Sequence, residues 1–152
     1  TAQQTAKIAA ESVTVAPAAP SSGEGGGDVM HTVGADGEVK VWNLVNGDRA
    51  GKQGGYAKEI TSIRFLGLTD QAFVTTAEKR ARILRIPLGN PANVRDLSGA
   101  VDVLHAGGVS VGGGVVAAGG ESGVLRVWKV ADGKLIASFE PPVADEVAKA
   151  AE

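Results

Sequence analysis

The stretch "GADGEVKVWNLVNGD" at residues 34–48 decides the fold of this chain, because the same pattern returns downstream. Residues 120–134, "GESGVLRVWKVADGK", match it in the turn glycines, in the alternating apolar residues and in the tryptophan. Trp42 and Trp128 are 86 residues apart, and the flanking glycines keep the same separation. Self-similarity at a fixed spacing indicates a structural unit that is repeated along the chain.

A weaker copy lies halfway between the two, at residues 77–90, "AEKRARILRIPLGN". In this register Leu84 occupies the position of Val41 and Val127. Arg85 then takes the position of the two tryptophans. The sequence therefore predicts three units with a period of 43 residues.

Each unit is expected to form four short antiparallel strands, because β-branched and aliphatic runs alternate with Gly, Asp and Asn turns. Asp-Gly in "ADGE" and Asn-Gly in "VNGD" are the strongest short hairpin signals. The first strands of the units are predicted at residues 12–17, 60–65 and 101–106, and a last apolar run lies at residues 134–139. The fold class that follows is all-β.

The predicted domain organisation places the three units between two ends of different composition. The units span residues 12–54, 55–98 and 99–140. Residues 1–11 fit either a strand or a short helix, and residues 141–152 fit either a linking tail or a docking helix. Residues 16–27 are rich in Pro, Ser and Gly, and we expect there a long loop between the first two strands of the first unit, with a linker as the alternative.

A glycine-rich segment at residues 112–117, "GGGVVA", fits the G-x-G-x-x-G/A spelling of a dinucleotide-binding turn. Such a turn needs a helix directly after it, so that the helix N-terminus meets the pyrophosphate. The residues that follow, "AGGESGVLRVW", predict a turn and a strand instead. We therefore expect a loop and the second strand of the third unit, with no cofactor.

Composition excludes several kinds of chemistry. The chain has no cysteine, which excludes disulfides, thiolate zinc sites and cysteine nucleophiles. It has only two histidines, which argues against a metal site with several histidine ligands. A net charge of −2 gives no bulk attraction to nucleic acid or to an anionic membrane, and no apolar run is long enough for a membrane helix. His105 lies near Asp102 and could form an acid–base pair, but no serine accompanies it in a nucleophile-elbow context. We predict no enzyme, no metal site and no cofactor.

The period of 43, the Asp-Gly turn, and "VKVWN" and "LRVWK" at the third strand resemble the WD-repeat β-propeller family over residues 12–140. The resemblance implies blades of four antiparallel strands and a tetrad of a turn Asp, a strand Ser or Thr, a Trp, and a His from a Gly-His pair. The first unit carries Asp36, Thr32 and Trp42 at these places, the second Lys79, Thr75 and Arg85, and the third Ser122, Ala118 and Trp128. No Gly-His pair occurs. The candidate structural residues are thus Thr32, Asp36, Trp42, Thr75 and Trp128.

Propellers usually close with four to eight blades, and only three can be placed in this chain. The resemblance therefore implies an incomplete propeller that is completed by other segments or by other chains in an oligomer. The expected function is non-catalytic protein–protein interaction, or a structural scaffold, within a larger assembly. The alternative is the propeller portion of a larger enzyme or electron-transfer protein whose active residues lie outside this sequence. The composition is typical of a bacterial protein of the cytoplasm or periplasm and leaves the compartment open.

The basic run "EKRARILR" at residues 78–85 is the candidate partner-binding surface. Lys79 and Arg80 fall in the turn between the second and third strands, and Arg82 lies in the strand itself. The run fits a patch for an acidic protein partner. It also fits a solvated turn with arginine stems covering apolar surface. Nucleic acid is disfavoured because acidic residues lie close by and exposed aromatic residues are few.

Overall fold

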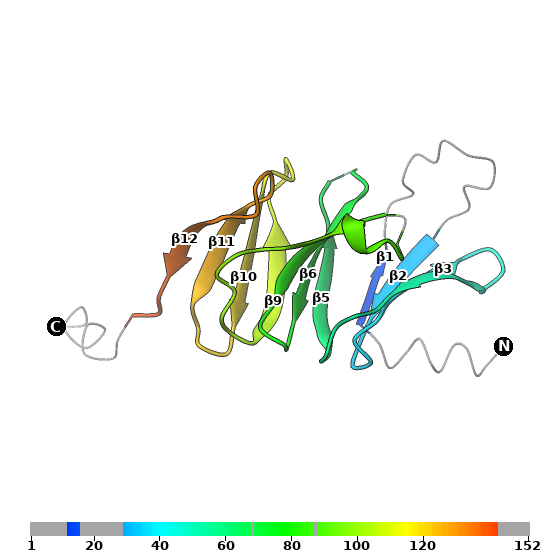
Figure 1. The fold of residues 1–152 in the computed structure, drawn as a ribbon, viewed down its shortest axis with the longest axis horizontal. Helices are drawn as coiled ribbons and strands as arrows, with labels where there is room; N and C mark the ends of the chain where they lie inside the picture. Colours follow the sequence, from blue (N-terminus) through cyan, green and yellow to red (C-terminus); the bar gives the residue numbers. More distant parts are fainter. Residues whose placement is uncertain (1–11, 16–28, 68, 87, 143–152) are drawn as a thin grey trace.

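The computed structural model describes residues 12–15, 29–67, 69–86 and 88–142, and it consists of three four-stranded antiparallel sheets (Figure 1). This confirms the predicted all-β class with propeller-like blades. The predictions for residues 1–11, 16–27 and 143–152 lie outside the described residues.

Each sheet is a meander in which consecutive strands pair, and we call the sheets blades 1 to 3. Blade 1 contains β1 (Ser12–Val15), β2 (Val29–Val33), β3 (Val39–Asn43) and β4 (Arg49–Gln53). Blade 2 contains β5 (Ile60–Phe65), β6 (Gln71–Thr76), β7 (Ala81–Arg85) and β8 (Val94–Asp96), with a 3-10 turn η1 (Pro91–Asn93) before β8. Blade 3 contains β9 (Leu104–Val109), β10 (Val115–Gly120), β11 (Leu125–Lys129) and β12 (Leu135–Phe139).

The blades stand side by side in chain order and stack through their first strands (Figure 1). Strand β5 packs against β1 and β2, and β9 packs against β5 and β6. Blade 2 therefore presents one face to blade 1 and the opposite face to blade 3, which is how neighbouring propeller blades are arranged.

Blade 2 is buried on both faces, because successive residues of a strand point to opposite sides of the sheet. Ala72 and Val74 of β6 join an apolar cluster shared with blade 1, whereas Phe73 joins a second cluster shared with blade 3. Every residue of β6 after Gln71 is buried. The near-continuous apolar pattern "AFV" in this strand follows from that double burial.

The central hairpins of the three blades share one register. Their last pairs are Val33 with Val39, Thr75 with Ala81, and Gly119 with Leu125, so each hairpin closes a five-residue turn. Equivalent residues are therefore 42 apart between blades 1 and 2, and 44 apart between blades 2 and 3. The uniform period of 43 is only the average of these two spacings.

This register corrects the predicted alignment of blade 2. Trp42 pairs with Met30 and Trp128 pairs with Val116, and the corresponding pair in blade 2 is Leu84 with Ala72. Leu84, and not Arg85, thus occupies the tryptophan position. The leucine is buried between blades 1 and 2, as its equivalence to a core tryptophan requires.

The first strand of blade 3 begins later than predicted. The sequence placed it at residues 101–106, whereas β9 begins at Leu104. Val103 instead accepts a hydrogen bond from the backbone N–H of Glu121 at 2.9 Å. A Cβ on Gly120 would lie 1.8 Å from the oxygen of Val103, so this close approach requires glycine. The glycine run at residues 112–117 forms a turn and the start of β10, as predicted, and no helix follows it.

Candidate functional site

The turn between the second and third strands has the same backbone shape in all three blades. Gly37, Lys79 and Gly123 occupy one equivalent position, with φ of 67°, 66° and 74°. Glycine adopts this left-handed conformation freely, whereas other residues pay about 1–2 kcal/mol for it. Blade 2 therefore places a lysine where the other two blades have glycine, and the side chain of Lys79 is exposed.

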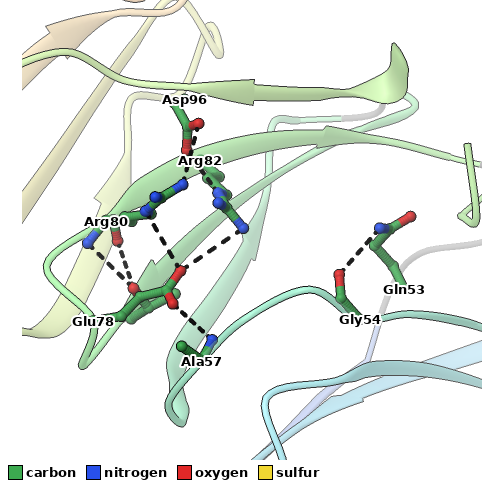
Figure 2. A network of polar contacts seen from close by, with 8 residues as sticks. Gln53, Gly54, Ala57, Glu78, Arg80, Arg82 and Asp96 are labelled. Atoms are coloured by element: carbon green, nitrogen blue, oxygen red, sulfur yellow. Dashed lines mark hydrogen bonds and ion pairs between the residues drawn. The ribbon is translucent and has the colours of Figure 1, made fainter. Parts of the chain in front are cut away.

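A cluster of charged residues surrounds this turn in blade 2 (Figure 2). Oε2 of Glu78 accepts a hydrogen bond from the backbone N–H of Ala57 at 2.7 Å, which ties the turn to the linker that enters blade 2. Oε1 of Glu78 lies 3.8 Å from both Arg80 and Arg82. Arg80 also lies 3.6 Å from Asp96, and its side chain is 52% exposed. The outermost part of the cluster thus consists of Lys79 and Arg80.

Arg82 lies inside the molecule, in the interface between blades 1 and 2. Its Nε donates to Asp96 at 2.6 Å, and its guanidinium carbon lies 4.6 Å from the ring centroid of Tyr56. Burial, the largest single influence, lowers the pKa of Arg82, but the hydrogen bond and charge of Asp96 together with the contribution of Tyr56 raise that pKa overall. Because only 8% of Arg82 is exposed, we leave it out of the candidate partner surface, which keeps Lys79 and Arg80.

Arg82 belongs to a column of buried cations that sequence reasoning missed. In the hairpin register, Lys40, Arg82 and Arg126 occupy equivalent positions and are each 8% exposed. Each of them lies two residues before the tryptophan position, in "KVW", "RIL" and "RVW". That spacing was visible in the sequence and would have placed Leu84 correctly.

The acid that pairs with each buried cation comes from a different place. In blade 1 it is the turn residue Asp36, which binds Nζ of Lys40. Glu78 holds the same turn position in blade 2. In blade 3 that position is Ser122, and Asp102 supplies the carboxylate, 3.7 Å from Nη1 of Arg126.

The candidate structural residues of blade 1 lie close together. The indole Nε1 of Trp42 donates to Oγ1 of Thr32 at 2.9 Å, and Thr32 is fully buried. Asp36 accepts a hydrogen bond from the backbone N–H of Glu38 at 3.1 Å in addition to that from Lys40. Burial alone would raise the pKa of Asp36, and the hydrogen bonds lower it overall. In this blade Asp36 is therefore bound to Lys40, and Thr32 and Trp42 form a separate hydrogen-bonded pair.

Thr75 lies one position further along its strand than Thr32, as the equivalent of Val33. It is fully buried and bonds to the hydroxyls of Ser62 at 2.7 Å and Thr61 at 2.8 Å. Because Thr61 donates its proton to the backbone oxygen of Leu104 at 2.7 Å, Thr75 donates to Thr61. Thr75 thus takes part in a hydroxyl relay from blade 2 to blade 3.

The acid of the predicted Asp102–His105 pair is bonded to Ser122 in the part of the chain that the structure describes. Asp102 accepts hydrogen bonds from the backbone N–H and the hydroxyl of Ser122, and these bonds lower the pKa of Asp102. His105 is exposed on β9. Within the described ranges there is no group of three or more His, Cys, Asp and Glu side chains placed to hold a metal ion. No helix in these ranges has the length and apolar character that a membrane crossing requires.

The fold and the recurring turn define a set of propeller-like blades, and comparison with known proteins agrees with this class. The chain is similar to apoptotic protease-activating factor 1 of Rattus norvegicus, with 29% identity over 101 residues, and of Homo sapiens, with 28% identity over 101 residues. The matched region covers 66% of this chain and only 8% of each of those proteins. That factor contains WD40 repeats, so the similarity supports a relationship to WD-repeat propellers at low identity. No family model matches the chain.

Proposed function

We propose that this chain is a non-catalytic protein-interaction module of the WD-repeat type, which binds an acidic protein surface through the turn of blade 2. The similarity to a WD-repeat protein supports protein–protein interaction in general terms. The observation that carries the choice of surface is the conformation of Lys79. This residue occupies the left-handed turn position that is glycine in the other two blades, and its side chain is exposed.

The structure around Lys79 favours recognition by charge. Lys79 makes no ion pair within the described residues, and Arg80 keeps about half of its side chain exposed. Beside the turn lies an open depression lined by Glu78, Lys79, Arg80, Asp96, Leu97 and Ala100. The bond from Ala57 to Glu78 holds the turn against the linker, so the two outer cations are presented on a rigid support.

Charge reversal tests this proposal. The probe is a fluorescein-labelled oligoglutamate peptide, and its binding to the full chain is followed by fluorescence anisotropy at low salt. We expect Lys79→Glu combined with Arg80→Glu to weaken binding at least tenfold. Lys134→Glu is the matched control, because Lys134 is exposed in the β11–β12 turn at the opposite end of its blade. Equal affinity for the wild-type chain and the double variant would contradict the proposal, as would equal loss in the control.

A further inference from the structure

The outer face of blade 3 is an apolar surface that the described parts of blades 1 and 2 do not cover. We define it by Val115, Ala117, Gly119, Leu125, Val127 and Phe139, which the strand register places on the side away from blade 2. None of the six is charged, and Lys129, which pairs with Val115, lies on the same face at its edge. Leu125 is 42% exposed and Phe139 is 57% exposed. Apolar side chains gathered on one exposed sheet face mark an interaction site.

The equivalent face is covered in both of the other blades. In blade 2 the residues at the positions of Ala117, Gly119, Leu125 and Val127 are Phe73, Thr75, Ala81 and Ile83, and each is at most 4% exposed. The cover is the tryptophan-bearing face of blade 3, and the rings of Phe73 and Trp128 lie 6.4 Å apart. Blade 1 is covered in the same way by the Leu84 face of blade 2.

The two interfaces inside the chain therefore follow one rule. The tryptophan-position face of each blade packs on the opposite face of the blade before it. The outer face of blade 3 is the next face in this series, so the surface expected to pack on it is the tryptophan-position face of a further blade. In blade 1 that face points away from blade 2, and its Met30 and Trp42 are partly exposed. The chain thus carries both halves of a third interface, one at each end of the stack.

The third interface is also prepared electrostatically. Each existing interface contains one buried basic residue that is paired with an acid. Arg82 pairs with Asp96, and Arg126 pairs with Asp102. The corresponding residue on the outward face of blade 1 is Lys40, which is itself buried and already paired with Asp36. A buried cation is tolerated in an interface only when it is paired, so Lys40 can be covered without leaving an isolated charge.

We propose that the outer face of blade 3 binds the Trp42 face of blade 1 in a second copy of this chain. The contact is head-to-tail, and two such contacts between two copies would close a ring of six blades. Closed propellers contain four to eight blades, so closure at two copies is geometrically acceptable. The proposal is independent of the Lys79 surface, which lies at the turn end of blade 2.

The first test is the mass of the full chain in solution, measured by native mass spectrometry and light scattering across a concentration series. We expect a species with twice the chain mass of 15.3 kDa at micromolar concentration. A chain that remains monomeric throughout the series would overturn the proposal.

Variants at the two ends identify the contact. Leu125→Glu with Phe139→Glu should give a folded monomer, because both side chains are substantially exposed. Met30→Glu should do the same from the other end. Val111→Glu is the matched control, since Val111 is fully exposed in a turn of blade 3, and it should keep the dimer. Circular dichroism establishes that each variant is folded.

Mixing the two variants separates head-to-tail contact from a symmetric contact between two blade 3 faces. The Met30→Glu copy retains an intact blade 3, and the Leu125→Glu/Phe139→Glu copy retains an intact blade 1. We expect the mixture to recover a dimer through the one intact interface. Failure to recover it, or a dimer that survives both sets of substitutions, would show that the partner face has been assigned wrongly.

Discussion

Trp128 of blade 3 donates its indole N–H to the backbone oxygen of Ser98, 2.5 Å away, in the segment that follows the last strand of blade 2. Trp42, at the equivalent position of blade 1, donates to Thr32 within its own blade. The difference follows from one residue, because Ala118 replaces the threonine in blade 3 and offers no hydroxyl. The same indole therefore stabilises a blade in one case and joins two blades in the other.

Replacing Lys79 with glycine should stabilise the chain by about 1 kcal/mol, because glycine removes the strain of a left-handed residue. Thermal and urea unfolding would measure the change. Lys79→Ala is the control that removes the charge and keeps the Cβ, and it should give no such gain. A Lys79→Gly variant that is less stable than the wild type would show that the turn is not strained at this position.

Arg82→Ala should destabilise the chain far more than Arg80→Ala. Arg82 is buried beside Asp96, Glu78 and the ring of Tyr56. Its loss removes this packing and the hydrogen bond to Asp96, and it leaves both acids with only the more exposed Arg80. The expected cost is about 2–4 kcal/mol, against about 0–1 kcal/mol for the half-exposed Arg80. Similar free energies of unfolding for the two variants would contradict the burial of Arg82.

Neighbouring glycines of β10 provide a test of the close contact between the turn of blade 3 and its linker. Gly120→Ala should cost about 2 kcal/mol or more, since the new Cβ would lie 1.8 Å from the backbone oxygen of Val103. Gly119→Ala should cost little, because no atom lies within 4 Å of its Cβ position. The urea midpoints of the two variants, measured side by side, compare these costs.

His31 should make the stability of the fold depend on pH. Burial lowers the pKa of His31 to about 4 from 6.5, and neither ring nitrogen has a hydrogen-bond partner within the described residues. In the unfolded chain His31 therefore binds a proton below pH 6.5, whereas in the folded chain it binds one only below about pH 4. Above pH 6.5 His31 is neutral in both states. The free energy of unfolding should fall by up to about 3 kcal/mol as the pH drops from 6.5 to about 4.

The measurement for His31 is the free energy of unfolding between pH 7 and pH 4. A His31→Leu variant should lose much of the slope, whereas His105→Leu, at an exposed histidine, should retain it. An identical slope in wild type and His31→Leu would assign the pH dependence to other groups.

The fold could be predicted from sequence where turns and tryptophans mark the unit. The glycines of "ADGE" and "ESGV" and the two tryptophans aligned the central hairpins of blades 1 and 3 correctly, because glycine adopts the left-handed turn conformation freely. Blade 2 lacks both marks, with Lys79 in the glycine position and Leu84 in the tryptophan position. An average period of 43 then shifted its alignment by one residue, and a shift of one residue exchanges the two faces of a strand.

The same shift explains what was missed at the candidate site. Lys79 and Arg80 were placed in the turn, as the structure has them, because a turn survives an error of one residue. Whether Arg82 faces a neighbouring blade depends on the register of blade 2, which the uniform period of 43 misplaced by one residue. The acids that pair with the buried cations could not be recognised from a repeated pattern. Asp36 and Glu78 lie in the turns of their blades, whereas Asp102 precedes the first strand of blade 3.

Three equivalent blades stack through one recurring interface, and blade 2 is enclosed on both sides. Amide hydrogen exchange of the full chain tests this arrangement most directly, because protection follows the burial and bonding of each strand. We predict that the amides of β6 exchange most slowly, through global unfolding, and that those of the edge strands β4 and β12 exchange fastest among the described strands. Exchange in β6 that is as fast as in β4 and β12 would contradict the stacked-blade account.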